Sequence, residues 1–135
     1  MEAGAFDQCE EPRFFASDHS GRPLADRDDV LVFQTPPLVR AVEVVGPISV
    51  ELYVSSDAAD TDFHVKLIDV HPPNEDYPAG FAMNLTDGIL RCRYRDSWEH
   101  PTLMTPGKAY RISVRAFPTS NLFKAGHRIR LDISS

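Results

Sequence analysis

Hydrophobic and polar residues alternate with a period of two along most of the chain. This is the pattern of β-strands, because successive side chains point to opposite faces of a sheet. Segment 46–56 is the clearest case, with Ile48, Val50, Leu52 and Val54 on one face and Ser49, Glu51, Tyr53 and Ser55 on the other. The same pattern predicts strands within 62–70, 109–117 and 127–135, and shorter ones within 29–35 and 40–46. It slips at Ile68, where we expect a bulge, and near Ala116.

Turn-forming residues separate these segments, and they break up any long helical pattern. The turn signals are Pro36-Pro37, Gly46-Pro47, Pro72-Pro73-Asn74, Asp87-Gly88, Pro106-Gly107 and Ala125-Gly126. A sheet with one apolar face must cover that face, and without helices the cover is a second sheet. The sequence therefore predicts an all-β sandwich of seven or eight strands. Periodicity leaves jelly-roll and immunoglobulin-like topologies open.

Length and composition narrow the class of protein. The 135 residues suffice for one domain, and the net charge of −6 argues against a nucleic-acid partner, whose phosphates attract Lys and Arg. Two cysteines, Cys9 and Cys92, are too few for a disulfide scaffold, so we expect free thiols. The chain has no apolar run of the ~20 residues that cross a bilayer, and no signal-peptide pattern. These features predict a cytoplasmic protein without a membrane partner.

Catalytic and metal-binding motifs are not found. The chain contains no G-x-S-x-G elbow, and its five histidines do not fall at a spacing that aims two of them at one metal. We therefore predict no catalytic residue, no cofactor and no metal. A stand-alone calcium- or carbohydrate-binding module stays open as the alternative. It would use the loop aspartates Asp26, Asp28, Asp29, Asp57, Asp60 and Asp62, or the aromatic rings of Tyr77, Phe81 and Trp98.

Three arginines alternate with apolar residues in "NLTDGILRCRYRD", residues 84–96: Arg91, Arg93 and Arg95. Neighbours two apart on a strand lie ~7 Å from each other, so their repulsion in a watery medium is only about 0.6 kcal/mol per pair. Because guanidinium groups form planar two-bond pairs with carboxylates, we expect partners on adjacent strands or on another domain. The alternative is that the three arginines form a surface that binds an anion.

Several longer motifs occur in a familiar order: "SSDAADTDF", "TDGILR" and "TSNLFKAGHRIRL". Together with "DVLVFQT" and "LMTPGKAYRISV" they resemble the C-terminal domain of the CocE/NonD hydrolases, a family of acyl esterases and X-Pro dipeptidyl peptidases. The resemblance covers most of the chain and weakens in 10–27 and 74–82. Besides the three arginines, the structural or interface candidates in these motifs are Asp60, Asp62, Asp87, Asn121 and His127.

The resemblance implies a jelly-roll, galactose-binding-like in shape only, packed on an upstream α/β-hydrolase domain that carries the Ser-His-Asp triad. This chain would then be non-catalytic, would buttress the catalytic domain, help wall its acyl pocket and contribute to a homodimer. We expect an irregular arm at 1–28 and the jelly-roll at 29–135. Family members continue past Ser135, so we expect the last strand to be missing, and segment 72–83 to be a longer local flap.

Overall fold

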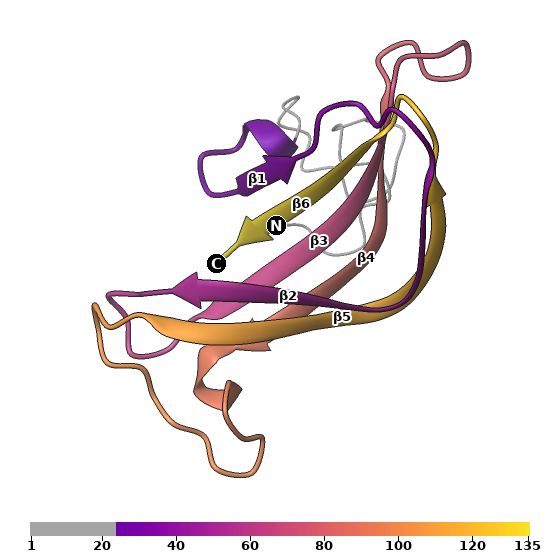
Figure 1. Ribbon diagram of the computed structural model, residues 1–135. Coiled ribbons are helices and arrows are strands. Elements are labelled where there is room, and N and C mark those ends of the chain that lie inside the picture. Colours follow the sequence, from indigo (N-terminus) through magenta and orange to yellow (C-terminus); the bar gives the residue numbers. More distant parts are fainter. Residues whose placement is uncertain (1–23) are drawn as a thin grey trace.

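Two antiparallel sheets form the fold in the computed structural model, which describes residues 24–135 (Figure 1). The elements are η1 (Leu24–Asp26), β1 (Leu31–Gln34), β2 (Val42–Val54), β3 (Asp62–His71), β4 (Phe81–Arg91), η2 (Cys92–Tyr94), β5 (Tyr110–Phe123) and β6 (Arg128–Ser134). One sheet has the order β1-β6-β3-β4, and the other is the pair β2-β5. The described range holds six strands instead of seven or eight, and no α-helix. The expected arm and the thiol of Cys9 fall largely or wholly outside the described residues.

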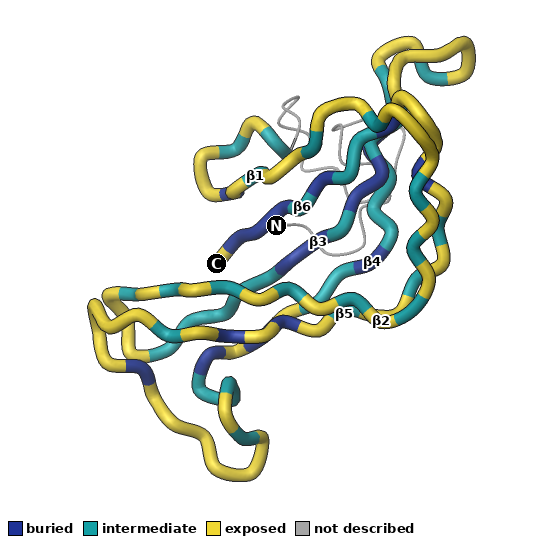
Figure 2. The backbone as a smooth tube through the Cα atoms, in the orientation of Figure 1, coloured by how far each residue is buried: buried dark blue, intermediate teal, exposed yellow. Residues whose placement is uncertain are grey.

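The two sheets lie face to face, and the core is between them. In β2 every second residue turns inward, as predicted, so that Val50, Leu52 and Val54 pack against the core. The buried core residues come from both layers and from the 92–104 connection: Val65, Leu90, Cys92, Met104, Ile112, Val114 and Ile133. Figure 2 shows buried residues along β3 and β6, and those of β5 are Ile112 and Val114 near its start and Phe123 at its end. The two packed sheets confirm the predicted β-sandwich, in which each fully buried aliphatic side chain stabilises the fold by about 1.5–3 kcal/mol.

The expected turn at Asp87-Gly88 is wrong, because both residues lie inside β4. A Cβ built on Gly88 would come 2.4 Å from the backbone oxygen of Arg115 in β5. Glycine is therefore required here because the backbones of the two sheets nearly touch, and a glycine inside a strand often marks such an approach. The expected turn at Gly46-Pro47 is wrong as well, since β2 runs through it with a register shift and a φ of 122° at Gly46.

Both slips in the hydrophobic pattern coincide with irregular pairing. Leu67 pairs with Thr86 and Ile68 with Asn84, so the register shifts where a bulge was expected. The extra, unpaired residue is Leu85 on β4, so the bulge lies on the strand opposite Ile68 and not on β3 itself. On β5 the register shift follows Ala116, the position of the second slip.

Candidate functional site

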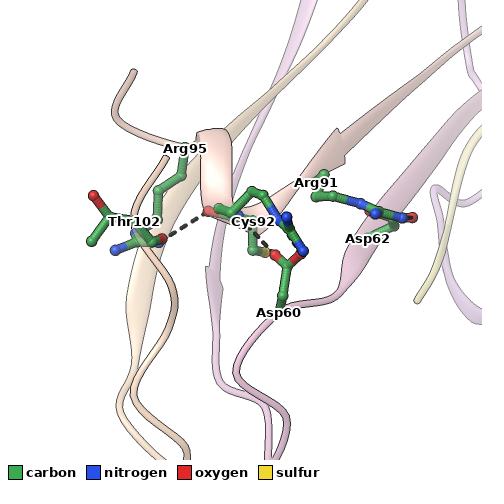
Figure 3. Close-up of polar contacts among 7 residues, drawn as sticks. Asp60, Asp62, Arg91, Cys92, Arg95 and Thr102 are labelled. Carbon is green, nitrogen blue, oxygen red and sulfur yellow. Dashed lines mark hydrogen bonds and ion pairs between the residues drawn. The ribbon is translucent and has the colours of Figure 1, made fainter. Parts of the chain in front are cut away.

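Arg91, the last residue of β4, pairs with Asp62, the first residue of β3 (Figure 3). Its Nε and Nη2 donate to the two carboxylate oxygens at 2.8 Å each. The hydrogen bonds from this guanidinium lower the pKa of Asp62 below its usual value of 3.8, against a smaller opposing effect of burial. The pairing is the cross-strand kind that fits a guanidinium and a carboxylate.

The other two arginines do not continue the strand. β4 ends at Arg91, and the chain turns into the short helix η2, so the ladder of alternating strand residues is wrong for Arg93 and Arg95. Arg93 donates from Nε to one oxygen of Asp60 at 2.6 Å, and from its backbone N–H to the other at 2.9 Å. Asp60 thus anchors the start of η2 to the loop before β3.

Arg95 differs from the other two arginines in that its side chain is only 6% exposed. Its Nη1 donates to the backbone oxygens of Cys92 and Thr102, at 3.0 and 2.5 Å. The guanidinium also lies 4.5 Å from the centre of the Tyr110 ring, in cation–π contact. Arg95 therefore links the two ends of the 92–102 connection from its buried side. Its guanidinium is engaged in these contacts and not in binding an anion from solvent.

The calcium alternative finds no support in these contacts. Asp60 and Asp62 accept hydrogen bonds from arginines, and Asp29 accepts two from Arg27. Carboxylates neutralised in this way are poor candidates for gathering around Ca²⁺, which needs several free oxygens. In residues 24–135, the group of side chains placed closely enough to share one ion is instead Asp69, His71 and His127.

This second cluster lies where β3 ends and β6 begins. Asp69 is 2% exposed and accepts from Asn121 Nδ2 at 3.1 Å, while its other oxygen lies 2.9 Å from His127 Nδ1. His71 Nε2 lies 3.5 Å from Asp69 Oδ2, is buried, and has no hydrogen-bond partner. Desolvation lowers the pKa of His71, against the opposing charge of Asp69.

The pairing of β3 with β6 explains why these residues meet. Val70 pairs with Arg128, so His71 and His127 follow at opposing positions just past the ladder, with ring centres 4.3 Å apart. Asp69 stands two residues before His71 and therefore on the same face. Local histidine spacing could not reveal this cluster, because its members are neighbours across strands and not along one. Of the sequence candidates, Asn121 and His127 belong to it.

Asp87 lies apart from both clusters. It faces His64 across β3 and β4, with His64 Nε2 and Asp87 Oδ2 3.0 Å apart. The eight sequence candidates therefore lie in three places along β3 instead of one. These are the arginine–aspartate pairs at its start, the His64–Asp87 contact in its middle, and the Asp69–His127 cluster at its end.

The aromatic rings considered for sugar binding lie in two separate places and do not form one platform. Phe81 is buried and stacks on Tyr77 in the 72–80 loop, with ring centres 4.6 Å apart. Trp98 is 73% exposed and stacks on Tyr94. A groove of about 380 Å³ beside this second pair is lined by Ile89, Leu90, Tyr94, Arg95, Trp98, Ser113 and Arg115. We name the exposed apolar surface of Ile89, Trp98 and Phe117 the Trp98 face.

Serine hydrolysis would need a hydroxyl hydrogen-bonded to an imidazole, and the part of the chain that the structure describes contains no such pair. No helix in the described range has the length and apolar character to span a membrane.

Comparison with known proteins adds independent information. Residues 3–135 match the family described as the X-Pro dipeptidyl-peptidase C-terminal non-catalytic domain. Over 114 residues the chain is 47% identical to cocaine esterase of Rhodococcus sp. (strain MB1 Bresler), a match that covers 84% of this chain and 19% of the relative.

Two solved structures have the same fold. An aminopeptidase from the marine sediment archaeon Thaumarchaeota archaeon is 33% identical with a TM-score of 0.79, covering 83% of this chain and 19% of that one. An α-amino acid ester hydrolase is 32% identical with a TM-score of 0.75, covering 86% and 19%. The chain thus spans about a fifth of the length of these relatives.

Proposed function

Because the chain belongs to the family of X-Pro dipeptidyl-peptidase C-terminal non-catalytic domains, we propose that it buttresses the α/β-hydrolase domain of a larger serine hydrolase. The family match over residues 3–135 is the observation that carries this proposal. The parent enzyme would cleave esters or amides, in keeping with the names of an esterase, an ester hydrolase and an aminopeptidase among its relatives. Its serine, histidine and aspartate would all come from outside this chain.

The Trp98 face is our candidate for the surface that meets the catalytic domain. Interface centres are enriched in aromatic residues and arginine, and Trp98 and Phe117 are 73% and 76% exposed beside Arg115. Monomeric domains rarely expose such large apolar side chains together without using them. By contrast, Arg91 and Arg93 are engaged with aspartates of this chain, so they fit an internal structural role better than a docking role.

The first experiment tests the non-catalytic assignment. The purified 135-residue chain is assayed on p-nitrophenyl acyl esters and on a Gly-Pro chromogenic substrate, and no turnover above the buffer rate is expected. Turnover that a serine-directed inhibitor abolishes would overturn the proposal. The gene sequence upstream of Met1 provides a second check, since an in-frame G-x-S-x-G motif followed by Asp and His is expected there.

The second experiment tests the docking face in the parent enzyme. Trp98→Ala and Phe117→Ala should shorten the half-life of esterase activity on heating, while leaving the melting temperature of the isolated chain within about 2 °C, because exposed positions contribute little to its own stability. Tyr53→Ala is the matched control, since Tyr53 is an equally exposed aromatic on the outer face of β2. Equal half-lives for Trp98→Ala, Tyr53→Ala and the unchanged enzyme would contradict this face.

Two finer parts of the proposal rest on the family resemblance. The domain would help wall the acyl pocket, so that its variants alter KM for bulky acyl groups more than for acetyl esters. It would also contribute to a homodimer, which light scattering of the parent enzyme would test.

A further inference from the structure

We propose that Asp69, His71 and His127 form a binding site for a divalent transition metal, with Zn²⁺ as the best-matched ion. The site is separate from the buttressing function, and it joins the end of β3 to the start of β6, the two middle strands of the four-stranded sheet.

The distances between the donor atoms fit one small ion. In a tetrahedral site with Zn–N and Zn–O bonds of about 2.0–2.2 Å, neighbouring ligand atoms lie about 3.3 Å apart. Here Asp69 Oδ1 lies 2.9 Å from His127 Nδ1, and Asp69 Oδ2 lies 3.5 Å from His71 Nε2, so each histidine faces a different oxygen of the carboxylate. One donor atom from each of the three residues lies within 4.8 Å of the others. Side-chain rotations that bring both imidazole nitrogens toward one carboxylate oxygen would close the set around an ion.

The nitrogen of His71 supplies an independent reason to expect a ligand. Nε2 is buried and lacks a hydrogen-bond partner, and burying a polar atom without a partner is unfavourable. Its nearest charged neighbour is the carboxylate of Asp69, at a distance too long for a good hydrogen bond. A metal ion between the two groups would satisfy the lone pair of the nitrogen and the charge of the carboxylate at once.

The surroundings hold these ligands in place. Asn121 on β5 donates to Asp69, which is how ligating carboxylates are commonly oriented by a neighbouring residue. The ring of Phe81 packs edge-on against His71 at 5.6 Å, and Tyr77 of the 72–80 loop stacks on Phe81. The imidazole is thus fixed by strands on one side and by the loop on the other.

The donor set selects the class of ion. Two imidazoles and one carboxylate suit Zn²⁺ and similar first-row ions, whereas Ca²⁺ and Mg²⁺ prefer oxygen ligands. Three protein ligands leave one position for water. Because the ligands come from β3 and from the turn between β5 and β6, a bound ion would fasten this connection between the two sheets to the end of β3.

The test uses the 135-residue chain freed of metal by a chelator and then titrated with ZnCl₂ alone. We expect about one Zn²⁺ per chain by elemental analysis after gel filtration, and a rise in melting temperature on Zn²⁺ addition. His71→Gln should abolish both effects, and Asn121→Ala should weaken Zn²⁺ binding roughly 10–100-fold. His64→Gln is the matched control, because His64 also lies on β3 beside an aspartate and should leave binding unchanged.

A spectroscopic measurement on the unaltered chain avoids any effect of substitution on folding. Zn²⁺ should shift the imidazole ¹⁵N resonances of His71 and His127 but not that of His64, and Co²⁺ should give the intense visible absorption of a tetrahedral site. Absence of stoichiometric binding, or binding that His71→Gln leaves intact, would overturn the proposal and identify the cluster as a hydrogen-bonded group without an ion.

Discussion

Arg91 and Asp62 face each other where β4 ends and β3 begins, joined by two parallel hydrogen bonds of 2.8 Å. The pair fixes the register at the end of the β3–β4 ladder, next to the loop that brings Asp60 to Arg93. Two neighbouring arginine–aspartate pairs therefore hold the point at which the strand turns into η2.

The first prediction concerns the pH dependence of this pair. The pKa of Asp62 is lowered in the folded state, so its stabilising effect is complete above the ordinary value of 3.8 and disappears as the pH falls through the lower folded value. Arg91→Gln should therefore lower the melting temperature at pH 7, and this difference from the unchanged chain should shrink below pH 3.8. A difference that stays constant down to pH 2 would assign the effect to packing instead of charge.

The second prediction concerns Gly88, where a Cβ would meet the backbone of β5 at 2.4 Å. Gly88→Ala should destabilise the fold by about 3 kcal/mol, because neither backbone can move without parting the sheets. Gly107→Ala is the comparison, since its surroundings are open and only its positive φ of 77° is strained, which costs about 1–2 kcal/mol. Urea unfolding of both variants measures the difference, and the reverse ranking would refute the close approach.

The third prediction contrasts a buried ion pair with an exposed one. Arg130 donates two hydrogen bonds to Asp132, at 2.8 and 2.6 Å, and both side chains are buried. Asp132→Asn leaves a buried guanidinium without its counter-charge, so a loss of about 3–5 kcal/mol in the free energy of unfolding is expected. Glu51→Gln removes the exposed partner of Arg111 and should cost at most about 1 kcal/mol. Chemical unfolding that gives equal losses would contradict this account.

The fourth prediction concerns the thiol of Cys92, which is buried in the core. Burial raises the pKa of this thiol, and the nearby negative charge of Asp60 adds to the effect. In a Cys9→Ser background, a disulfide reagent at pH 8 should therefore react with the folded chain slower than with the urea-unfolded chain, on the order of a hundredfold or more. Similar rates in the two states would place Cys92 at the surface.

The sequence predicted β2 best, because this strand has one core face and one solvent face, and the alternation of residues 48–54 records that difference directly. β3 shows a weaker pattern because it lies in the middle of its sheet, where Lys66 and Asp69 are buried along with Val65 and Ile68. The turn predicted at Asp87-Gly88 is wrong because local sequence contains no sign of the β5 backbone that lies against Gly88.

The candidate sites were predicted less completely than the fold. The pairing of an arginine with a carboxylate on the adjacent strand is found at Arg91, but the sequence did not reveal that the strand stops there. His71 is not among the sequence candidates, since its partner His127 is 56 residues away along the chain. Contacts of this kind depend on strand order and register, which periodicity alone does not determine.

The position of β6 between β1 and β3 has a consequence for biosynthesis. Since β6 is translated after every strand it joins, a nascent chain that has already emerged through β5 still lacks one of the two middle strands of its larger sheet. Until β6 has emerged, the edge of β3 that will pair with it has unpaired backbone groups, and β1 has no strand to pair with. Chaperones that shield exposed strand edges would therefore act on this domain late, in the interval before residues 128–134 leave the ribosome.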